Sequence, residues 1–144
     1  MTTRLAHRGP DFQGVFIDGP LAFGHRRLSV LDTRDVANQP MTDDSGRFVI
    51  VHNGEIYNFR EIRKDLEARG IRFRTNSDTE VILEAYKTFG EDCLRHFNGM
   101  FAFAIWDISR QQLFCARDRL GIKPFHYARK DGLFIFASEI KSLL

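Results

Sequence analysis

Residues 101–106, Phe-Ala-Phe-Ala-Ile-Trp, alternate as an extended strand would, and they are apolar on both faces. A strand of this kind is buried on both sides, because neither face tolerates water. It therefore needs a cover above and below, which predicts a layered domain. The 14 phenylalanines agree with a thick core between packed layers, and 144 residues with 43% hydrophobic side chains suffice for one such domain.

Two segments, residues 58–70 and 77–90, have apolar side chains at helical spacing and a glycine at the end. Asn58 and Ser77 are the expected N-caps. In each helix a glutamate lies three residues after the cap, where its carboxylate is expected to bond back to the cap residue.

Most of the remaining chain is predicted to form short strands. Asp18-Gly19-Pro20 is a hairpin turn signal, and hairpin-length connections imply antiparallel pairing. A final helix is expected to begin at Ser138. The order of strands, two helices, strands and a helix start indicates an α+β fold. The predicted strands are Gly14–Ile17, Leu21–Leu28, Phe48–His52, residues 71–74, the strand through 101–106, Leu113–Ala116, Phe125–Ala128 and Leu133–Ala137.

Charge and composition exclude several classes of function. The 21 Lys plus Arg nearly balance 19 Asp plus Glu, so there is no electrostatic case for nucleic acid or an anionic membrane. No apolar run could cross a bilayer, and no secretory signal follows Met1. Cys93 and Cys115 are too few for a disulfide scaffold, which favours a cytoplasmic setting. The five histidines have no metal-site spacing, so no metal is expected.

Seven segments occur in the order and roughly the spacing of one known family, and together they are highly specific. The chain resembles the class II glutamine amidotransferase (glutaminase) domain of asparagine synthetases from His7 to its C-terminus. The segments are His7–Asp11 (HRGPD), Arg27–Ser29 (RLS), Asn53–Asn58 (NGEIYN), Ser77–Glu80 (SDTE), Asn98–Ala104 (NGMFAFA), Arg117–Pro124 (RDRLGIKP) and Ala137–Lys141 (ASEIK).

The resemblance implies an N-terminal nucleophile (Ntn) hydrolase fold, an αββα sandwich of antiparallel sheets, with residues 1–144 as one type 2 amidotransferase domain. In that family an N-terminal cysteine, with its own α-amino group as base, attacks the glutamine side-chain amide and releases ammonia. The partner is a C-terminal synthetase domain, in which ammonia attacks an aspartyl-AMP made from aspartate and ATP. The resemblance implies no cofactor for this domain, and ATP and Mg for the synthetase domain.

Five residues match the family's glutamine site. The side-chain amide of Asn53 and the backbone N–H of Gly54 match its oxyanion hole, where only glycine is expected to let the substrate come close. Arg27 matches the arginine that holds the substrate carboxylate with its planar fork. Asp78 matches the carboxylate that binds the ammonium group, with Glu55 as a helper.

Each of these residues also has a structural interpretation. Asn-Gly is a common turn, and Asn98-Gly99 repeats it without a role in the family. Asp78 could be an ordinary first-turn helix charge, and Arg27 one of several basic residues on a half-exposed strand. Arg117 and Asp118 are expected to form a buried structural ion pair.

The chain departs from the family at its start, because the HRGPD segment begins already at His7 and no N-terminal cysteine or first strand precedes it. Thr2 has no strand around it to serve as a nucleophile. Three explanations stay open: a truncated amidotransferase, a natural non-catalytic domain as in β-lactam synthetases, or a free-standing glutamine-binding module. Without a first strand, homodimerisation through an open sheet edge is expected.

Overall fold

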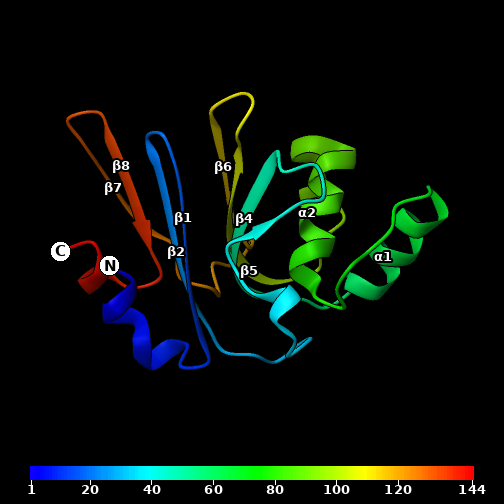
Figure 1. Ribbon diagram of the computed structural model, residues 1–144, viewed down its shortest axis with the longest axis horizontal. Coiled ribbons are helices and arrows are strands. Elements are labelled where there is room, and N and C mark those ends of the chain that lie inside the picture. Colours follow the sequence, from blue (N-terminus) through cyan, green and yellow to red (C-terminus); the bar gives the residue numbers. More distant parts are fainter.

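A computed structural model describes all residues, 1–144 (Figure 1). It contains eight strands, two α-helices and four 3-10 segments. The strands are β1 Phe12–Asp18, β2 Leu21–Arg27, β3 Met41–Thr42, β4 Phe48–Ile56, β5 Gly99–Asp107, β6 Gln112–Arg117, β7 His126–Lys130 and β8 Leu133–Ala137. The helical elements are η1 Thr2–Arg8, η2 Asp35–Ala37, α1 Phe59–Ala68, α2 Asp78–Phe89, η3 Gly90–Arg95 and η4 Ile140–Ser142.

A four-stranded antiparallel sheet of order β3-β4-β5-β6 forms the middle of the domain. Strand β5 is buried on both faces from Phe101 to Asp107, as its double apolar pattern predicted. The face of β5 that carries Phe101 and Phe103 packs with α1 and α2 in the larger core, which also includes Ile50 and Val81. The other face of the sheet packs in a smaller core around Trp106.

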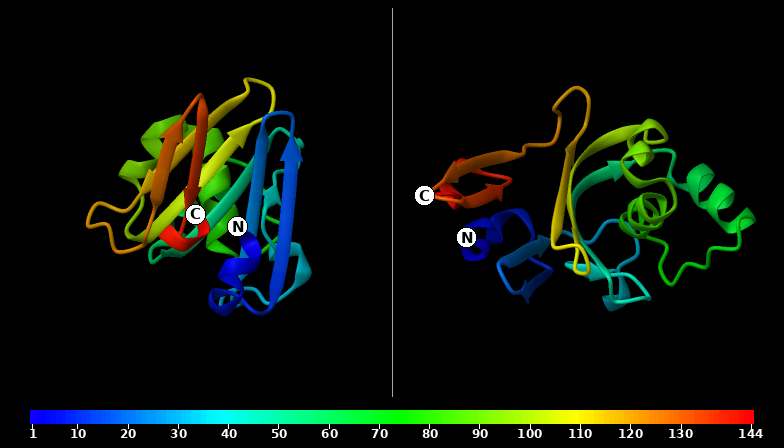
Figure 2. Two further views of the ribbon diagram at one scale, coloured as in Figure 1. Left: turned by 90° about the vertical axis from the view of Figure 1, so that its left-hand side faces the viewer. Right: turned by 90° about the horizontal axis from the view of Figure 1, so that it is seen from above.

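Two separate hairpins, β1-β2 and β7-β8, cover that other face. Figure 2 shows the hairpins on one side of the central sheet and the helices on the other. Phe23 of β2 and Phe136 of β8 meet edge to face, with ring centroids 6.0 Å apart. The hairpins join at one end through η1 and η4, where His7 Nε2 lies 2.8 Å from Glu139 Oε1. The antiparallel pairing of every strand agrees with the prediction from hairpin-length turns.

The capping predictions are partly confirmed. Ser77 caps α2, because its Oγ accepts the Thr79 N–H at 3.0 Å. Glu80 does not close a capping box; its carboxylate accepts the backbone N–H groups of Arg74 and Thr75 instead. Asn58 lies at the N-cap position of α1 without a side-chain cap bond, since its amide group bonds across to the chain after η3.

Three predictions about the extent of secondary-structure elements are wrong. Residues 71–74 are not a strand, because their backbone is held by Glu80 rather than by a neighbouring strand. Strand β4 does not stop at His52 but continues to Ile56, paired with β5 throughout. Ser138 caps no helix, and only the short η4 follows it.

Arg117 and Asp118 do not form the expected ion pair. Arg117 donates to the carbonyls of Gly121 and Lys123, both at 2.6 Å, and Asp118 accepts the N–H groups of Ile122 and Lys123. Both side chains therefore shape the 118–123 loop independently. None of the helices is long and apolar enough to cross a membrane.

Candidate functional site

A cleft of about 310 Å³ lies between the end of β2, the end of β4 and the N-terminus of α2. This volume is at the lower end of the range for small-molecule sites. All five residues predicted from the sequence line it, although they are spread over three elements. They are Arg27, Asn53, Gly54, Glu55 and Asp78.

The end of β4 directs two of these side chains toward the hairpins. Strand alternation puts Asn53 and Glu55 on the same face as Val51, which packs in the smaller core on the hairpin side. The Asn53 Nδ2 atom lies 3.5 Å from Ser138 Oγ, at the far limit of a hydrogen bond. The amide of Asn53 is therefore only loosely held and stands at the wall of the cleft.

The backbone of β4 offers one N–H group to the cleft. The N–H of His52 donates to Gln39 Oε1 at 2.6 Å, and the N–H of Ile56 donates to Asp78 Oδ2 at 3.0 Å. Both groups therefore point away from β5. Because N–H directions alternate along an antiparallel strand, the N–H of Gly54 points to the same side, between these two.

Gly54 is also required by the neighbouring strand. Its φ is +149°, and an added Cβ would come within 2.1 Å of the Met100 carbonyl oxygen. Gly99 on β5 is equally close to β4, since an added Cβ there would lie 2.2 Å from the Glu55 carbonyl oxygen. The two Asn-Gly dipeptides thus share a steric role at the β4–β5 contact, and neither is a free turn.

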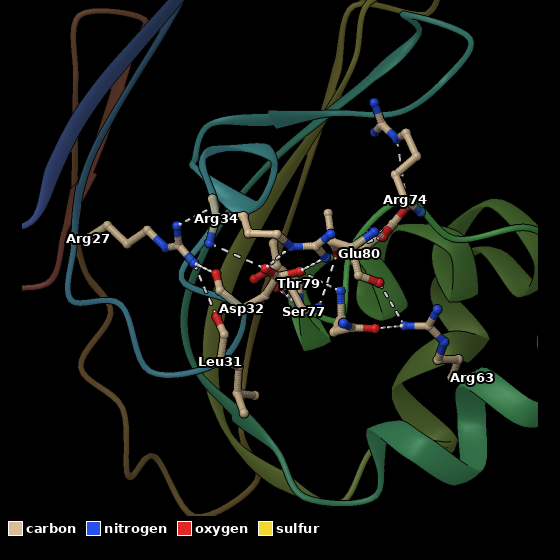
Figure 3. A network of polar contacts seen from close by, with 11 residues as sticks. Arg27, Leu31, Asp32, Arg34, Arg63, Arg74, Ser77, Thr79 and Glu80 are labelled. Atoms are coloured by element: carbon tan, nitrogen blue, oxygen red, sulfur yellow. Dashed lines mark hydrogen bonds and ion pairs between the residues drawn. The ribbon is translucent and has the colours of Figure 1, made fainter.

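Arg27 is buried at 6% exposure and organises the loop that follows β2. Its Nη1 donates to Asn38 Oδ1 at 2.7 Å and to the Arg34 carbonyl at 3.3 Å. Its Nη2 donates to the carbonyls of Leu31, at 3.1 Å, and Asp32. Figure 3 shows Arg27 with its loop partners Leu31, Asp32 and Arg34. All acceptors are neutral, so the positive charge of Arg27 has no ionic partner.

Asp78 is the first residue of α2 and is buried at 5% exposure. Burial raises the pKa of its carboxyl group, and hydrogen bonds from backbone N–H groups, first that of Ile56, partly oppose this rise. No Lys, Arg or His lies within salt-bridge distance of Asp78, in contrast to Asp43, which pairs with Lys87 at 3.1 Å.

Two buried ionisable side chains of opposite kind therefore line one cleft, and neither has an ionic partner in the protein. Burying a charge without a counter-ion costs free energy, so such charges are rare unless a ligand supplies the partner. The arrangement suits a ligand that carries one carboxylate and one ammonium group. The neutral amide of Asn53 and the backbone of Gly54 line the same cleft.

Several lining residues were not singled out from the sequence. Gln39 connects β4 to α2, since its Nε2 donates to Thr79 Oγ1 at 3.3 Å while its Oε1 accepts the His52 N–H. His52 is buried against the same hydroxyl, with Nδ1 3.2 Å from it. Burial lowers the pKa of His52 to about 3. Lys123 also lines the cleft. No local signal marks these positions, because each depends on contacts between distant segments.

Neither cysteine belongs to this site. Cys93 is fully buried in η3, and Cys115 lies in β6. Burial raises the pKa of Cys93 to about 12 and that of Cys115 to about 11. Both therefore stay protonated at neutral pH and are poor nucleophiles.

A family model described as a glutamine amidotransferase domain matches residues 1–144, the whole chain. The chain belongs to this glutamine amidotransferase family. The asparagine synthetase resemblance read from the seven motifs is confirmed by relatives at 41–49% identity.

Two of those relatives span bacteria and archaea. Asparagine synthetase [glutamine-hydrolyzing] 3 of Bacillus subtilis is 49% identical over 100% of this amidotransferase chain. A putative asparagine synthetase [glutamine-hydrolyzing] 2 of Methanocaldococcus jannaschii is 41% identical, also over 100% of the chain. The chain covers only 24% and 31% of these two relatives. It thus spans about a quarter of the length of the curated relatives it matches.

The amidotransferase fold is confirmed by a solved structure. Glutamine phosphoribosylpyrophosphate (PRPP) amidotransferase from B. subtilis, complexed with ADP and GMP, superimposes with a TM-score of 0.72 and 26% sequence identity. The match covers 85% of this chain and 28% of that one. The predicted α+β, Ntn hydrolase-like arrangement of antiparallel sheets and helices is therefore correct.

Proposed function

We propose that the cleft binds glutamine and that the domain is the glutaminase part of an asparagine synthetase-like enzyme. The observation that carries this proposal is that Arg27 and Asp78, both buried and without an ionic partner, line one cleft. A free α-amino acid supplies a carboxylate for the first and an ammonium group for the second. The carboxylate of the half-buried Glu55 adds a second acceptor for the ammonium group.

The rest of the cleft suits the glutamine side chain. Hydrolysis of a side-chain amide passes through a tetrahedral intermediate with a negatively charged oxygen. The N–H of Gly54 and the side-chain amide of Asn53 are the two donors for that oxygen. The alternation of β4 supports this role, because it leaves the Gly54 N–H directed between the two hydrogen bonds of His52 and Ile56.

The reaction that would use the released ammonia requires a part of the longer proteins outside the match. The relatives bear the name asparagine synthetase [glutamine-hydrolyzing], and three-quarters of their length lies outside the match. We propose that released ammonia serves an ATP- and Mg-dependent amidation of aspartate in a C-terminal synthetase domain. The domain itself needs no cofactor for this role, and two free thiols suit a reduced, cytoplasmic setting.

Residues 1–144 by themselves bind glutamine without cleaving it. The reaction needs a thiolate, and the pKa values of the buried Cys93 and the half-buried Cys115 are both raised. A non-catalytic, glutamine-binding domain, as in β-lactam synthetases, is therefore the second candidate. The same burial of Cys93 and Cys115 favours it.

Calorimetric titration of the chain with glutamine tests the binding role. Wild-type protein should bind, and Asp78→Asn should weaken binding about tenfold or more, since a hydrogen bond to a charged group contributes about 1.5–3 kcal/mol. Asp65→Ala on α1 is the matched control, because Asp65 is exposed and makes no polar contact. Equal affinity in all three proteins, or no binding at all, would contradict the proposal.

Extension of the chain at its N-terminus by the Met-Cys segment of the family tests the catalytic role. The extended protein should release glutamate from glutamine, and Asn53→Ala should slow it by about a hundredfold or more. Hydrolysis that is indifferent to Asn53 would show that the oxyanion assignment is wrong. An extended protein that binds but never hydrolyses would favour the non-catalytic candidate.

A further inference from the structure

Asp32 lies outside the five site residues, yet it contacts both sides of the cleft. It belongs to the loop after β2, and its side chain is only 2% exposed. Its backbone carbonyl accepts a hydrogen bond from Arg27 Nη2. Its carboxylate Oδ2 accepts the backbone N–H of Asn76 at 2.7 Å. Asn76 stands immediately before the Ser77 cap and Asp78, so Asp32 connects the two charged ends of the cleft.

The backbone conformation of Asp32 indicates that these contacts matter. Its φ is +47°, in the left-handed region that non-glycine residues seldom adopt. Asp and Asn tolerate this region better than other side chains, because their short polar groups bond locally. Here the carboxylate accepts Arg34 Nε at 2.7 Å and Arg34 Nη2 at 2.5 Å. The guanidinium group of Arg34 lowers the pKa of Asp32, which keeps the carboxylate ionised.

The segment before α2 is held from three sides. Arg63 of α1 donates to the Thr75 carbonyl at 2.7 Å, and Glu80 of α2 accepts the Thr75 N–H at 2.7 Å. These two contacts fix the segment to the helices. Asp32 ties it to the loop that holds Arg27 through the hydrogen bonds of its carbonyl and carboxylate, and Figure 3 shows Asp32 between Arg27 and the start of α2.

We propose that Asp32 is a positioning residue that sets Arg27 relative to the N-terminus of α2, and so sets the spacing between the carboxylate and ammonium sites of the cleft. This inference rests on the proposed binding of glutamine. It assigns the selectivity for an α-amino acid, whose two charges are separated by a single carbon, to a residue that does not touch the ligand. Asp32 acts through Arg27 on one side and through the Asn76 N–H on the other.

The first test uses the unliganded chain and needs no glutamine. Asp32→Gly removes the carboxylate and accepts the left-handed backbone without strain. We expect the NMR signals of the Arg27 side-chain Nε–H and of the Asn76 amide both to shift in this variant. Asp44→Ala is the matched control, since it removes another Asp–Arg pair, to Arg74 at 2.6 Å, without contact to the Arg27 loop. An unchanged Arg27 signal in Asp32→Gly would overturn the proposal.

The second test compares the dissociation constants of glutamine and 4-aminobutanamide, which lacks the α-carboxylate. The two ligands differ only in the α-carboxylate, so the ratio of their dissociation constants measures how strongly Arg27 binds that group. The ratio does not depend on the fraction of folded protein. Asp32→Gly should reduce the preference for glutamine about tenfold, the loss of one hydrogen bond to a charged group. Asp32→Asn keeps an acceptor for Asn76 and should stay within about threefold of wild type, because Arg34 is 58% exposed and its ion pair contributes little.

Asn76→Pro removes the same hydrogen bond from the donor side and should reproduce the change in ratio if Asp32→Gly does not fold. A ratio that stays at the wild-type value in both variants would overturn the role of Asp32. A wild-type chain that binds neither compound would overturn the proposed function instead, while the Arg27 signal would still decide whether Asp32 positions it.

Discussion

The backbone N–H of Ile56, the last residue of β4, donates to the carboxylate of Asp78, the first residue of α2, at 3.0 Å. This bond joins the strand that carries Asn53 and Gly54 to the helix that carries the buried acid. Any ligand that spans the cleft therefore contacts two elements whose relative position is already fixed.

Two replacements of Asp78 should distinguish the stabilisation by this hydrogen bond from the effect of the carboxylate charge. Asp78→Ala leaves the buried Ile56 N–H without an acceptor and should lower the free energy of unfolding by about 1–3 kcal/mol. Asp78→Asn keeps an oxygen for that N–H and should lie within about 1 kcal/mol of wild type. Urea denaturation followed by far-UV circular dichroism measures both. Equal losses in the two variants would mean that the charge, and not the hydrogen bond, stabilises the fold.

Gly54→Ala should be strongly destabilising, because the new methyl group would meet the Met100 carbonyl at 2.1 Å in a backbone with φ of +149°. Overpacking and strain together are expected to cost about 3 kcal/mol or more. Gly70→Ala is the matched control, since Gly70 also has a positive φ, +90°, but open space around it. The control should cost only about 1 kcal/mol. Thermal melts that drop equally in both variants would refute the close approach to β5.

The two thiols should react slowly in the folded chain. With pKa values near 12 for Cys93 and 11 for Cys115, the thiolate fraction at pH 8 is far below that of a free cysteine. Labelling by a thiol-specific disulfide reagent should be roughly a hundredfold slower in buffer than in denaturant. Rapid labelling of either cysteine in the native protein would reopen its assignment as an inert core residue.

His25 should make the stability depend on pH. Burial lowers its pKa to about 4, while its Nε2 lies 3.0 Å from the His52 carbonyl. As the pH falls from about 6.5 to 4, the unfolded chain binds a proton at His25 and the folded chain does not. The contribution of His25 is therefore complete above about pH 6.5 and is lost on acidification, by on the order of 3 kcal/mol.

His25→Gln tests this dependence, since glutamine keeps a donor for the His52 carbonyl but does not titrate. Its free energy of unfolding should fall less than that of wild type between pH 7 and pH 4.5. His52, and the carboxyl groups of Asp78 and Glu84 with their raised pKa values, are present in both proteins and cancel in the difference. Parallel curves for the two proteins would argue against a buried, neutral His25.

The facing edges of β2 and β8 should govern association. The two hairpins are not hydrogen-bonded to each other, and an apolar groove of about 300 Å³ lies between them. Unpaired strand edges beside apolar surface favour edge-to-edge pairing with another chain. We expect sedimentation velocity to show dimers, and the edge amides of β2 and β8 to exchange more slowly in the dimer than in the monomer at high dilution. A monomer with uniformly protected strands would show that the groove closes without a partner.

Local patterns in the sequence were enough for most of the elements. Helix α2 was predicted with its Ser77 cap and its end at Gly90, because both signals lie within a few residues of the helix. The double burial of β5 followed from alternation alone. The five site residues came from motif resemblance rather than from physical reasoning on single positions. The structure adds that they line one cleft.

Two of the failed predictions have one cause, which is that a side chain binds backbone groups instead of the partner expected for it. Glu80 was expected to close a capping box, but the backbone of residues 74–75 binds it instead. Arg117 and Asp118 were expected to pair with each other, and both bind carbonyl or N–H groups of the 118–123 loop.

The sequence by itself determined the layered α+β class, the antiparallel pairing and the family, because periodicity and motif order are properties of the chain. Only the tertiary structure decided that Arg27 and Asp78 lack ionic partners, that the Gly54 N–H faces a cleft, and that Asp32 connects its two sides. The cleft depends on contacts between distant residues, such as Ile56 with Asp78, 22 positions apart, and Asp32 with Asn76, 44 positions apart. A carboxylate or guanidinium group is equally able to pair, cap or bind a ligand until packing fixes its neighbours.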